Sequence, residues 1–306
     1  MATASRIKWV AIGGGTGLAT LLRGLRPHLG EVALTAIVTV TDDGHSSGRL
    51  REEFGVLPPG DIRNCLVALS DPNLVMTRLF AHRFPGEGEL GGHSLGNLLI
   101  LGLTQLTPDL LSATDEARAL LGIDARVLPA TLDPVDLVGL VGDREVRGQV
   151  AIKARKEPIR RLSIAPDDAR ALDQAVHAIL EADVITLGPG SLYTSVIANL
   201  LIDGIRQALT DARGMKVYIC NVMSEADETE SLTATDHITE LLSYAGDLKL
   251  DYALFNSSPI SAEMRDRYAL EGAIALPVPE LTVLPGTETR LICMPLASEE
   301  GFVRHD

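Results

Sequence analysis

Aromatic residues, cysteines and long hydrophobic runs are all scarce in this chain. Its five Phe, five Tyr and one Trp argue mildly against a site that stacks a flavin-like group. The three cysteines, Cys65, Cys220 and Cys293, lie far apart and are odd in number, which argues against a disulfide framework and a zinc site. No apolar run reaches membrane-spanning length, and the stretch 1–5 is too short for a signal peptide. We therefore expect a cytoplasmic protein without membrane insertion.

Basic residues are also in the minority. Lys and Arg number 27 against 41 Asp and Glu, which gives a net charge of −14. This surplus of negative charge disfavours nucleic acids and anionic membranes as partners. With 306 residues, of which 46% are hydrophobic, the chain is long and apolar enough to bury a large core. An acidic protein of this kind has to bind phosphate with local devices: helix N-termini, a few arginines or a metal ion.

Several familiar nucleotide-binding and catalytic motifs are missing. A P-loop ends in Gly-Lys-Ser/Thr, but here Gly17 is followed by Leu18 and Ala19. The pattern G-x-G-x-x-G fails as well, because its last position falls on Leu18 or Thr20. No G-x-S-x-G elbow and no His/Cys cluster of zinc spacing occurs, which disfavours a Ser-His-Asp hydrolase and a zinc enzyme. An NAD(P)-dependent oxidoreductase is weakened but stays open, since Asp42 could hold a ribose hydroxyl.

A glycine-rich loop lies between a predicted strand and a predicted helix near the start of the chain. Residues 7–12 form a short apolar run, and leucines then recur at helical spacing, with Gly30 placed to end the helix. Glycine has no Cβ, so the loop can bring backbone N–H groups against a ligand, and the helix adds its own N–H groups and dipole. We interpret the loop as a phosphate site; a turn that only lets the helix pack is the alternative. Its residues are Gly13, Gly14, Gly15, Thr16 and Gly17.

Two adjacent carboxylates, Asp42 and Asp43, follow a second predicted strand at 34–40. Carboxylates at a strand end suit a hard divalent cation such as Mg²⁺, which often bridges to phosphate. Arginines and acids are mixed over residues 42–64, and such a mixture can hold a pyrophosphate together with its metal. A solvated loop with surface ion pairs is the alternative. Within this segment we expect a loop at 44–51 and a helix that Asp61 caps.

The rest of the chain alternates strands with helices. Helices without intervening strands are expected over about 61–122 as a helical layer or lid, and strands with a hairpin over about 126–161. A second glycine loop, 188–191, again lies between a strand and a helix. The pattern predicts one α/β domain over 1–306 with a doubly wound, mostly parallel, Rossmann-like sheet. Ligands of such sheets bind beyond the carboxyl ends of the strands, where both glycine loops and Asn221 are expected.

Four further segments are assigned structural roles. The basic stretch 153–161 is predicted to be an exposed strand edge, and the acidic segment 224–231 an exposed loop. His93 is interpreted as a helix-start residue, and a late strand is expected at 273–278.

Several unusual motifs occur in an order that resembles the YvcK family of gluconeogenesis factors. The resemblance extends from Gly13 to Asn256 and so covers most of the chain. The matching blocks are the first glycine loop, Thr41-Asp42-Asp43-Gly44, Ser46-Ser47-Gly48-Arg49-Leu50-Arg51, Pro58-Pro59-Gly60-Asp61-Ile62-Arg63-Asn64-Cys65, His93-Ser94-x-Gly96-Asn97-Leu98, Gly188-Pro189-Gly190-Ser191-Leu192-Tyr193-Thr194-Ser195 and Cys220-Asn221.

This resemblance implies a cytoplasmic bacterial protein that binds UDP-sugars, notably UDP-N-acetylglucosamine. It also implies a regulatory role in cell shape and wall synthesis during growth on gluconeogenic carbon sources. The sister CofD family, the 2-phospho-L-lactate transferases, shares the fold and transfers a phospholactyl-type group from a nucleoside diphosphate carrier with magnesium. A CofD-like transferase is therefore the alternative function, and the NAD(P)-dependent oxidoreductase is the weaker one. The sequence leaves turnover and homo-oligomerisation open.

The predicted site combines the motifs with this resemblance. The predicted phosphate- and nucleotide-binding residues are Gly13, Gly14, Gly15, Thr16, Gly17, Arg49, Asn64, Gly188, Pro189, Gly190, Ser191 and Asn221. The predicted metal ligands are Asp42 and Asp43, with magnesium expected wherever a diphosphate is bound. The chain departs from the family pattern at His45, where a second glycine is usual, and at Ala198, where a proline is usual. The segment 224–227 is also more acidic than the pattern leads one to expect.

Overall fold

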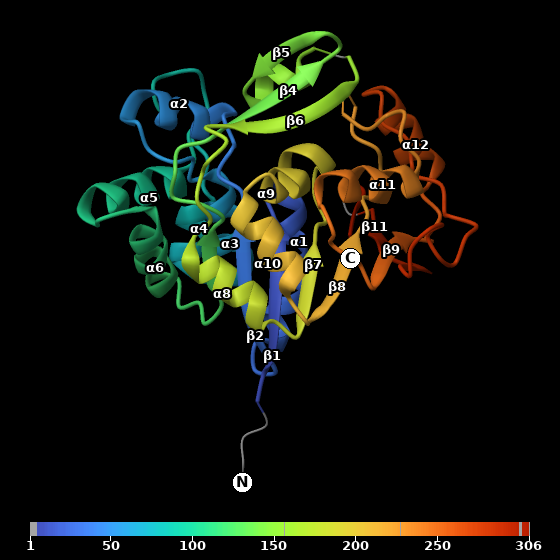
Figure 1. The fold of residues 1–306 in the computed structure, drawn as a ribbon. Coiled ribbons are helices and arrows are strands. Elements are labelled where there is room, and N and C mark those ends of the chain that lie inside the picture. Colours follow the sequence, from blue (N-terminus) through green and yellow to red (C-terminus); the bar gives the residue numbers. More distant parts are fainter. Residues whose placement is uncertain (1–4, 156, 227, 300–301, 306) are drawn as a thin grey trace.

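A seven-stranded parallel sheet forms the centre of the protein (Figure 1). The computed structural model describes residues 5–155, 157–226, 228–299 and 302–305. The strand order is β10-β9-β8-β7-β1-β2-β3, and every neighbouring pair is parallel. This confirms the predicted Rossmann-like α/β class. The strands are β1 (Ile7–Gly13), β2 (Val32–Val38), β3 (Arg126–Pro129), β7 (Val184–Leu187), β8 (Met215–Ile219), β9 (Tyr252–Asn256) and β10 (Arg290–Met294).

Helices cover both faces of this sheet. Figure 1 shows α8 and α10 in front of the central strands, and α1 packs with α3 on the other side. Helices α4, α5 and α6 form a layer beside β3. Among the described residues, no helix combines the length and the apolar composition needed to cross a bilayer. The helices are α1 (Gly15–Leu25), α2 (His45–Phe54), α3 (Gly60–Leu69), α4 (Val75–Ala81), α5 (Leu95–Leu106), α6 (Leu110–Leu120), α7 (Gln149–Lys153), α8 (Asp173–Glu181), α9 (Ala198–Leu200), α10 (Asp203–Asp211), α11 (Ala234–Tyr244) and α12 (Ala262–Ala269).

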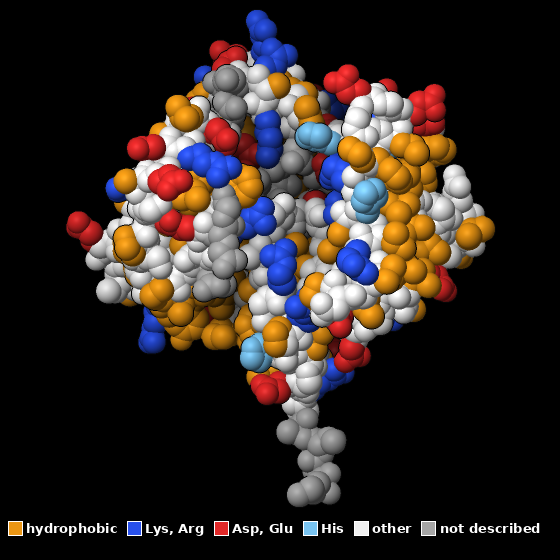
Figure 2. All heavy atoms as spheres, turned by 180° about the vertical axis from the view of Figure 1, so that it is seen from behind, with side chains coloured by type: hydrophobic (Ala, Val, Ile, Leu, Met, Phe, Trp, Pro, Cys, Tyr) orange, Lys and Arg blue, Asp and Glu red, His pale blue; other side chains and the backbone are white. Residues whose placement is uncertain are grey.

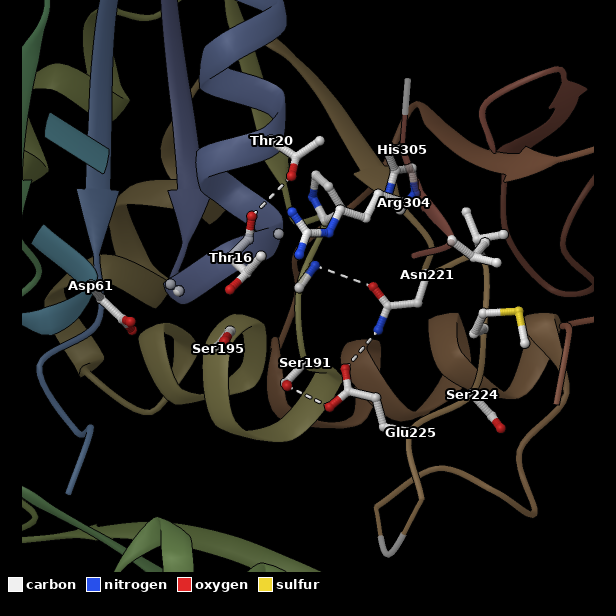
Figure 3. Close-up of a pocket in the computed structure, with 18 of the residues that line it drawn as sticks. Thr16, Thr20, Asp61, Ser191, Ser195, Asn221, Ser224, Glu225, Arg304 and His305 are labelled. Carbon is white, nitrogen blue, oxygen red and sulfur yellow. Dashed lines mark hydrogen bonds between the residues drawn. The ribbon is translucent and has the colours of Figure 1, made fainter. Parts of the chain in front are cut away.

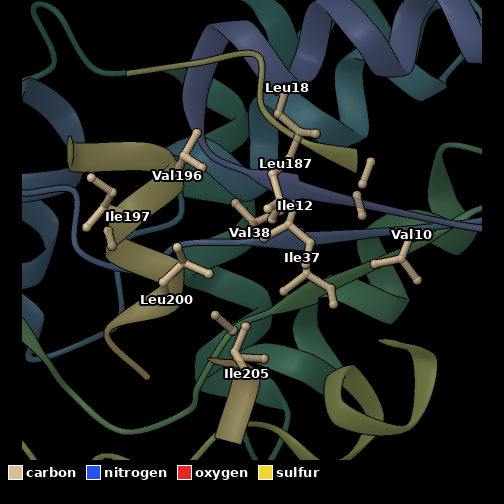
Figure 4. Close-up of a cluster of buried hydrophobic side chains, with 14 of the residues drawn as sticks. Val10, Ile12, Leu18, Ile37, Val38, Leu187, Val196, Ile197, Leu200 and Ile205 are labelled. Carbon is tan, nitrogen blue, oxygen red and sulfur yellow. The ribbon is translucent and has the colours of Figure 1, made fainter. Parts of the chain in front are cut away.

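The core lies on both sides of the central strands. Ile12, Ile37 and Leu187 are fully buried within the sheet. Figure 4 shows Leu18 of α1 on one side of these strands and Ile205 of α10 on the other. Burial on both faces explains why β1, β2 and β7 have continuous apolar sequences instead of alternating ones. It also holds the carboxyl ends of the strands in fixed positions for the site.

A small antiparallel sheet, β5-β4-β6, stands beyond the carboxyl ends of the central strands (Figure 1). It consists of β4 (Asp136–Val141), β5 (Arg144–Arg147) and β6 (Ile159–Ala165), with α7 between β5 and β6. We call residues 136–165 the hairpin unit. Arg51 of α2 donates to the Val135 carbonyl over 2.9 Å and pairs with Asp136 over 2.5 Å, which fixes the unit against the main body. The hairpin unit therefore covers the edge of the sheet where the ligand site is predicted.

Helix α2 replaces the loop that was predicted after the Asp42-Asp43 pair. Gly44 donates its N–H to the Asp42 side chain over 3.0 Å, and the helix begins at the next residue. Leu50 is buried, and Gly55 ends the helix in the left-handed conformation. The prediction missed this helix because Leu50 and Phe54 are the only apolar side chains among its ten residues, which gives no helical stripe.

Other boundaries also differ from the predictions. Helix α1 passes at Leu25 into a short 3₁₀ turn, Arg26–His28, so Gly30 does not cap it. Asp61 lies in the first turn of α3 and makes no cap, because the helix already begins at Gly60. The predicted late strand at 273–278 is present only as an isolated bridge between Ala275 and Met223.

Candidate ligand site at the switch point of the sheet

The two glycine loops lie side by side because their strands are neighbours. Chain connections run from β1 to β2 and β3 on one side, whereas β7 to β10 continue on the other side. The strand order therefore reverses between β1 and β7, and loops that leave such a switch point separate to form a crevice. The crevice here is opened by the loops 13–17 and 188–191.

A cavity of about 370 Å³ occupies this crevice (Figure 3). Both glycine loops, the ends of β2 and β8, α3, the hairpin unit and the last residues of the chain contribute to its wall. Its lining includes Gly14, Gly15, Thr16, Gly17, Thr20, Asp42, Asp61, Gln149, Pro189, Gly190, Ser191, Ser195, Asn221, Met223, Glu225, Tyr268, Arg304 and His305. On the face opposite to that in Figure 1, Lys and Arg side chains gather around a central hollow (Figure 2).

The first loop contacts the second through Gly17. A Cβ at this position would lie 2.5 Å from the Pro189 carbonyl oxygen and 2.6 Å from the Gly190 Cα. Both of these are backbone atoms, which cannot rotate out of the way. Only glycine therefore allows the two loops to approach as closely as they do.

The N-terminus of α1 is approached by a carboxylate of the protein itself. Asp61 accepts a hydrogen bond from the Gly15 N–H, at the position where the loop was predicted to bind phosphate. Burial, together with the neighbouring Asp42 carboxylate, raises the pKa of Asp61 to about 7. Asp42 and Asp61 both line the cavity, so two acids meet at this end of it.

The second loop is held by a network of neutral and charged side chains. The Gly190 N–H donates to Asn221 Oδ1 over 3.2 Å, and Asn221 Nδ2 donates to Glu225 Oε1 over 3.0 Å. Ser191 Oγ donates to the other oxygen of Glu225 over 2.5 Å. Figure 3 shows these hydrogen bonds joining the loop to the segment after β8. Residue Glu225 thus binds both the loop and its partner Asn221.

The acidic segment 224–231 contains no helix or strand among its described residues, as predicted, but only Glu230 and Ser231 of these residues are exposed; Asp227 lies outside the described residues. Glu228 is buried, and Lys153 Nζ lies 2.5 Å from Glu228 Oε1 and 3.9 Å from Glu225 Oε2. Burial and the neighbouring Glu225 raise the pKa of Glu228 to about 7, although Lys153 opposes this. The pKa of Lys153 is raised, because these two carboxylates outweigh the effect of burial. Lys153 ends α7, so this ion pair ties the hairpin unit to the segment after β8.

The last residues of the chain supply groups that sequence reasoning missed. Tyr268, Arg304 and His305 line the cavity although they lie far along the chain from the loops. His305 Nε2 is 2.9 Å from the Cys220 carbonyl oxygen, and the Val303 N–H donates to the Tyr268 hydroxyl over 3.1 Å. Figure 3 shows the Arg304 guanidinium directed toward Thr16 and Thr20 of the first loop and helix. No local motif marks these residues, since long-range packing alone brings them to the site.

Most of the predicted site residues meet in the cavity, and a few do not. Nine of the fourteen line it directly, namely Gly14, Gly15, Thr16, Gly17, Asp42, Pro189, Gly190, Ser191 and Asn221. Gly13 and Gly188 flank them in the two loops, and the Gly13 carbonyl accepts a hydrogen bond from Asn199.

The remaining three predicted residues lie outside both the cavity wall and the two glycine loops. Asp43 accepts a hydrogen bond from the Val150 N–H of the hairpin unit over 2.9 Å. Arg49 donates to the Gly91 carbonyl over 2.7 Å, and Asn64 lies on α3. His93, predicted at a helix start, directly precedes Ser94, the N-cap of α5, and its buried ring lies 3.0 Å from the Ser46 hydroxyl. Within the described residues, no group of three or more His, Cys, Asp or Glu is arranged to hold a metal ion.

The fold and the site define a Rossmann-like α/β protein with a glycine-lined cavity at the switch point of its sheet. The chain belongs to the CofD family: residues 9–284 match the family described as 2-phospho-L-lactate transferase CofD. It is also 44% identical over 267 residues to the gluconeogenesis factor of Bacillus subtilis, covering 87% of this chain and 84% of that protein.

Other relatives agree with this placement. A crystal structure of an upf0052-family protein from Bacillus halodurans superimposes with a TM-score of 0.93 at 42% identity, covering 99% of this chain and 97% of that one. The gluconeogenesis factor of Halalkalibacterium halodurans is 45% identical over 265 residues, covering 86% of this chain and 82% of that protein. The similarity to gluconeogenesis factors thus extends over most of the chain.

Proposed function

We propose that this protein binds a nucleoside diphosphate-sugar of the UDP-N-acetylglucosamine type in the switch-point cavity. In this proposal it acts in the cytoplasm as a regulatory protein that supports cell shape and wall synthesis on gluconeogenic carbon sources. The single observation that carries the binding proposal is the pairing of two glycine loops around one cavity. Both loops and the N-terminus of α1 face this cavity, and the Gly15 and Gly190 N–H groups would exchange Asp61 and Asn221 for phosphate oxygens when a diphosphate binds.

The residues around Arg304 support a ligand longer than a diphosphate. The Arg304 guanidinium faces the first loop, where it could grip phosphate oxygens. Tyr268 and Met223 pack with Val303 in the cavity wall, next to Arg304, and offer apolar surface to a nucleoside. The relatives that are named gluconeogenesis factors support the regulatory part of the proposal.

Magnesium belongs to the same proposal. Asp42 and Asp61 both line the cavity, and the pKa of Asp61 is raised to about 7 partly because Asp42 lies nearby. A cation between them would relieve this repulsion. Mg²⁺ commonly uses one or two carboxylates and takes its other ligands from phosphate and water, which fits a pair of acids beside a diphosphate site. We therefore propose Asp42 with Asp61, in place of Asp43, as the residues that would hold magnesium.

A magnesium-dependent transferase is the alternative, and membership of the CofD family favours it. Such an enzyme would transfer a phospholactyl-type group from a nucleoside diphosphate carrier to an acceptor hydroxyl. Both proposals use the same cavity, and they differ in whether product forms.

Calorimetry tests the binding proposal. UDP-N-acetylglucosamine, GDP- and ADP-linked sugars, UDP and NAD⁺ are titrated into the protein with magnesium and with EDTA. We expect UDP-N-acetylglucosamine to bind most tightly and to lose affinity in EDTA. Preferential binding of NAD⁺ that does not depend on metal would overturn the proposal and revive the oxidoreductase. Incubation with acceptor alcohols, followed by mass spectrometry, separates the two functions, because only a transferase yields a new phosphodiester.

A further inference from the structure

The end of the cavity opposite to the proposed nucleoside position differs in its charged and hydrogen-bonding groups. Figure 3 shows Asp61 and Arg304 on opposite sides of Thr16. The Arg304 side offers a cation and apolar surface, whereas Asp42 and Asp61 lie together on the other side, next to Gln149, whose neighbour Val150 bonds to Asp43. The proposed magnesium at Asp42 and Asp61 would bring the terminal phosphate of the ligand to this end, so the group attached to that phosphate would lie beside Gln149.

Gln149 is the one described residue of the hairpin unit that lines the cavity. The Asp43 carboxylate lies against the backbone on both sides of Gln149 and bonds to it on one side. The Val150 N–H donates to Asp43 Oδ1 over 2.9 Å, and a Cβ on Gly148 would lie 2.3 Å from Asp43 Oδ2. Gly148 has a φ of +95°, which favours glycine, so the turn into α7 depends on this close approach. The ion pair between Lys153 and Glu228 fixes the other end of α7.

The amide of Gln149 has the chemistry to recognise hydroxyl groups. It carries two N–H donors and one carbonyl acceptor and no charge. Within the described chain, the Gln149 side chain makes no hydrogen bond, so its donors and acceptor are available in the cavity. A sugar hydroxyl both donates and accepts, and the Gln149 amide offers it both an acceptor and a donor.

We propose that this end of the cavity is a subsite for an uncharged, hydroxyl-bearing group attached to the terminal phosphate of the ligand. Gln149 is the side chain that distinguishes such a ligand from the bare nucleoside diphosphate. This inference rests on the proposed nucleotide-binding function and assigns a part of the ligand to the hairpin unit. It also explains why a segment that contributes a single side chain to the cavity is docked so firmly through Asp43 and Lys153.

The test compares two ligands on two variants. Dissociation constants for UDP and for UDP-N-acetylglucosamine are measured by calorimetry with magnesium for the wild type, Gln149→Ala and Gln207→Ala. Gln207 is the matched control, because it lies on α10 and bonds to Asp211 there. We expect Gln149→Ala to weaken the sugar nucleotide roughly five- to tenfold, the loss of one or two hydrogen bonds, and to leave UDP unchanged. Gln207→Ala should change neither constant.

Three results would overturn the inference. Equal weakening of both ligands would place Gln149 at the phosphates, and unchanged constants would remove it from recognition altogether. Equal affinity of the wild type for UDP and its sugar conjugate would show that no such subsite exists, while the nucleotide-binding proposal would survive. If the wild type binds neither ligand, the proposed function itself fails. Should Gln149→Ala lose its thermal transition, Gln149→Met keeps the length of the side chain without its hydrogen bonds and takes its place.

Discussion

The two glycine loops of this protein have similar sequences but differ in what holds their backbone. The first loop leads into α1, a regular helix that buries Leu18 and Leu22. The second loop leads into a π-helical segment, Leu192–Ile197, in which every residue is buried. The Gly15 N–H of the first loop meets the Asp61 carboxylate, whereas the Gly190 N–H of the second meets the Asn221 amide.

The first loop therefore contacts a side chain whose charge can change, whereas the second loop contacts a side chain that is always neutral. Asp61 titrates with a pKa of about 7, so its charge at the first loop depends on pH and on any cation nearby. Asn221 carries no titratable proton, and its orientation is set by Glu225. We therefore expect the first loop to control when an anion binds and the second to control how it is oriented.

Gly17→Ala should have the largest effect, because it breaks the contact that joins the loops. The new Cβ would lie 2.5 Å from the Pro189 carbonyl oxygen, so backbone must shift. We expect a loss of stability of about 1–3 kcal/mol, as for other overpacked sites, and loss of nucleotide binding. Urea unfolding and calorimetry measure the two effects.

Gly24→Ala is the matched control for this substitution. Gly24 lies on the same helix, and a Cβ there would meet nothing within 4 Å. Alanine should therefore stabilise the helix by up to about 1 kcal/mol and leave binding intact. If Gly17→Ala behaves like Gly24→Ala, the loops do not need their close approach.

Asp61→Asn should remove the feature that sets the first loop apart, its response to pH. The pKa of Asp61 lies near 7 in the folded protein, above the usual value of 3.8 for the unfolded chain. The folded state therefore holds a proton that the unfolded state has lost, and stability falls as the pH rises from about 4 to about 7. Asparagine has no such proton, so the melting temperature of Asp61→Asn should exceed that of the wild type by a margin that grows with pH and levels off above 7.

Thermal melting between pH 5 and pH 8 measures this margin. Asp247→Asn, at an exposed position, serves as the control and should follow the wild type at every pH. A constant difference between Asp61→Asn and the wild type would mean that Asp61 is ionised throughout the range, and the comparison of the two loops would lose its basis.

The glycine loops and the strand ends could be predicted from the sequence because their signals are local. A short apolar run followed by glycines and a leucine stripe specifies strand, loop and helix without reference to the rest of the chain, as loop 13–17 shows. The parallel sheet then requires that such loops share an edge. Asn221 was predicted for the same reason, because it follows the end of β8.

The partners of these loops could not be predicted, because they arrive from distant segments. The sequence predicts Asp61 as a helix cap. Its carboxylate faces Gly15 only because α3 packs against α1. Arg304 and Tyr268 carry no motif, and their place depends on how the end of the chain packs against α1. Asp43 shows the limit of local reasoning, since its neighbour Asp42 lines the cavity while Asp43 itself binds the hairpin unit.

Ser191→Ala should have the smallest effect and should sharpen the contrast with Asp61. The Ser191 hydroxyl donates to Glu225 over 2.5 Å, and its loss leaves Glu225 bound to Asn221, so the second loop keeps its main contact. We expect affinity for the nucleotide to fall about fivefold, equivalent to about 1 kcal/mol, the usual worth of one hydrogen bond. Because serine does not titrate, the fall should be the same at pH 6 and pH 8, in contrast to the pH-dependent effect of Asp61→Asn.

Ser243→Ala on α11, whose hydroxyl donates to the Glu240 carbonyl over 2.7 Å, controls for the removal of a hydroxyl elsewhere. Calorimetry at the two pH values decides the matter, and a fall confined to one of them would show that the second loop also depends on a titrating group.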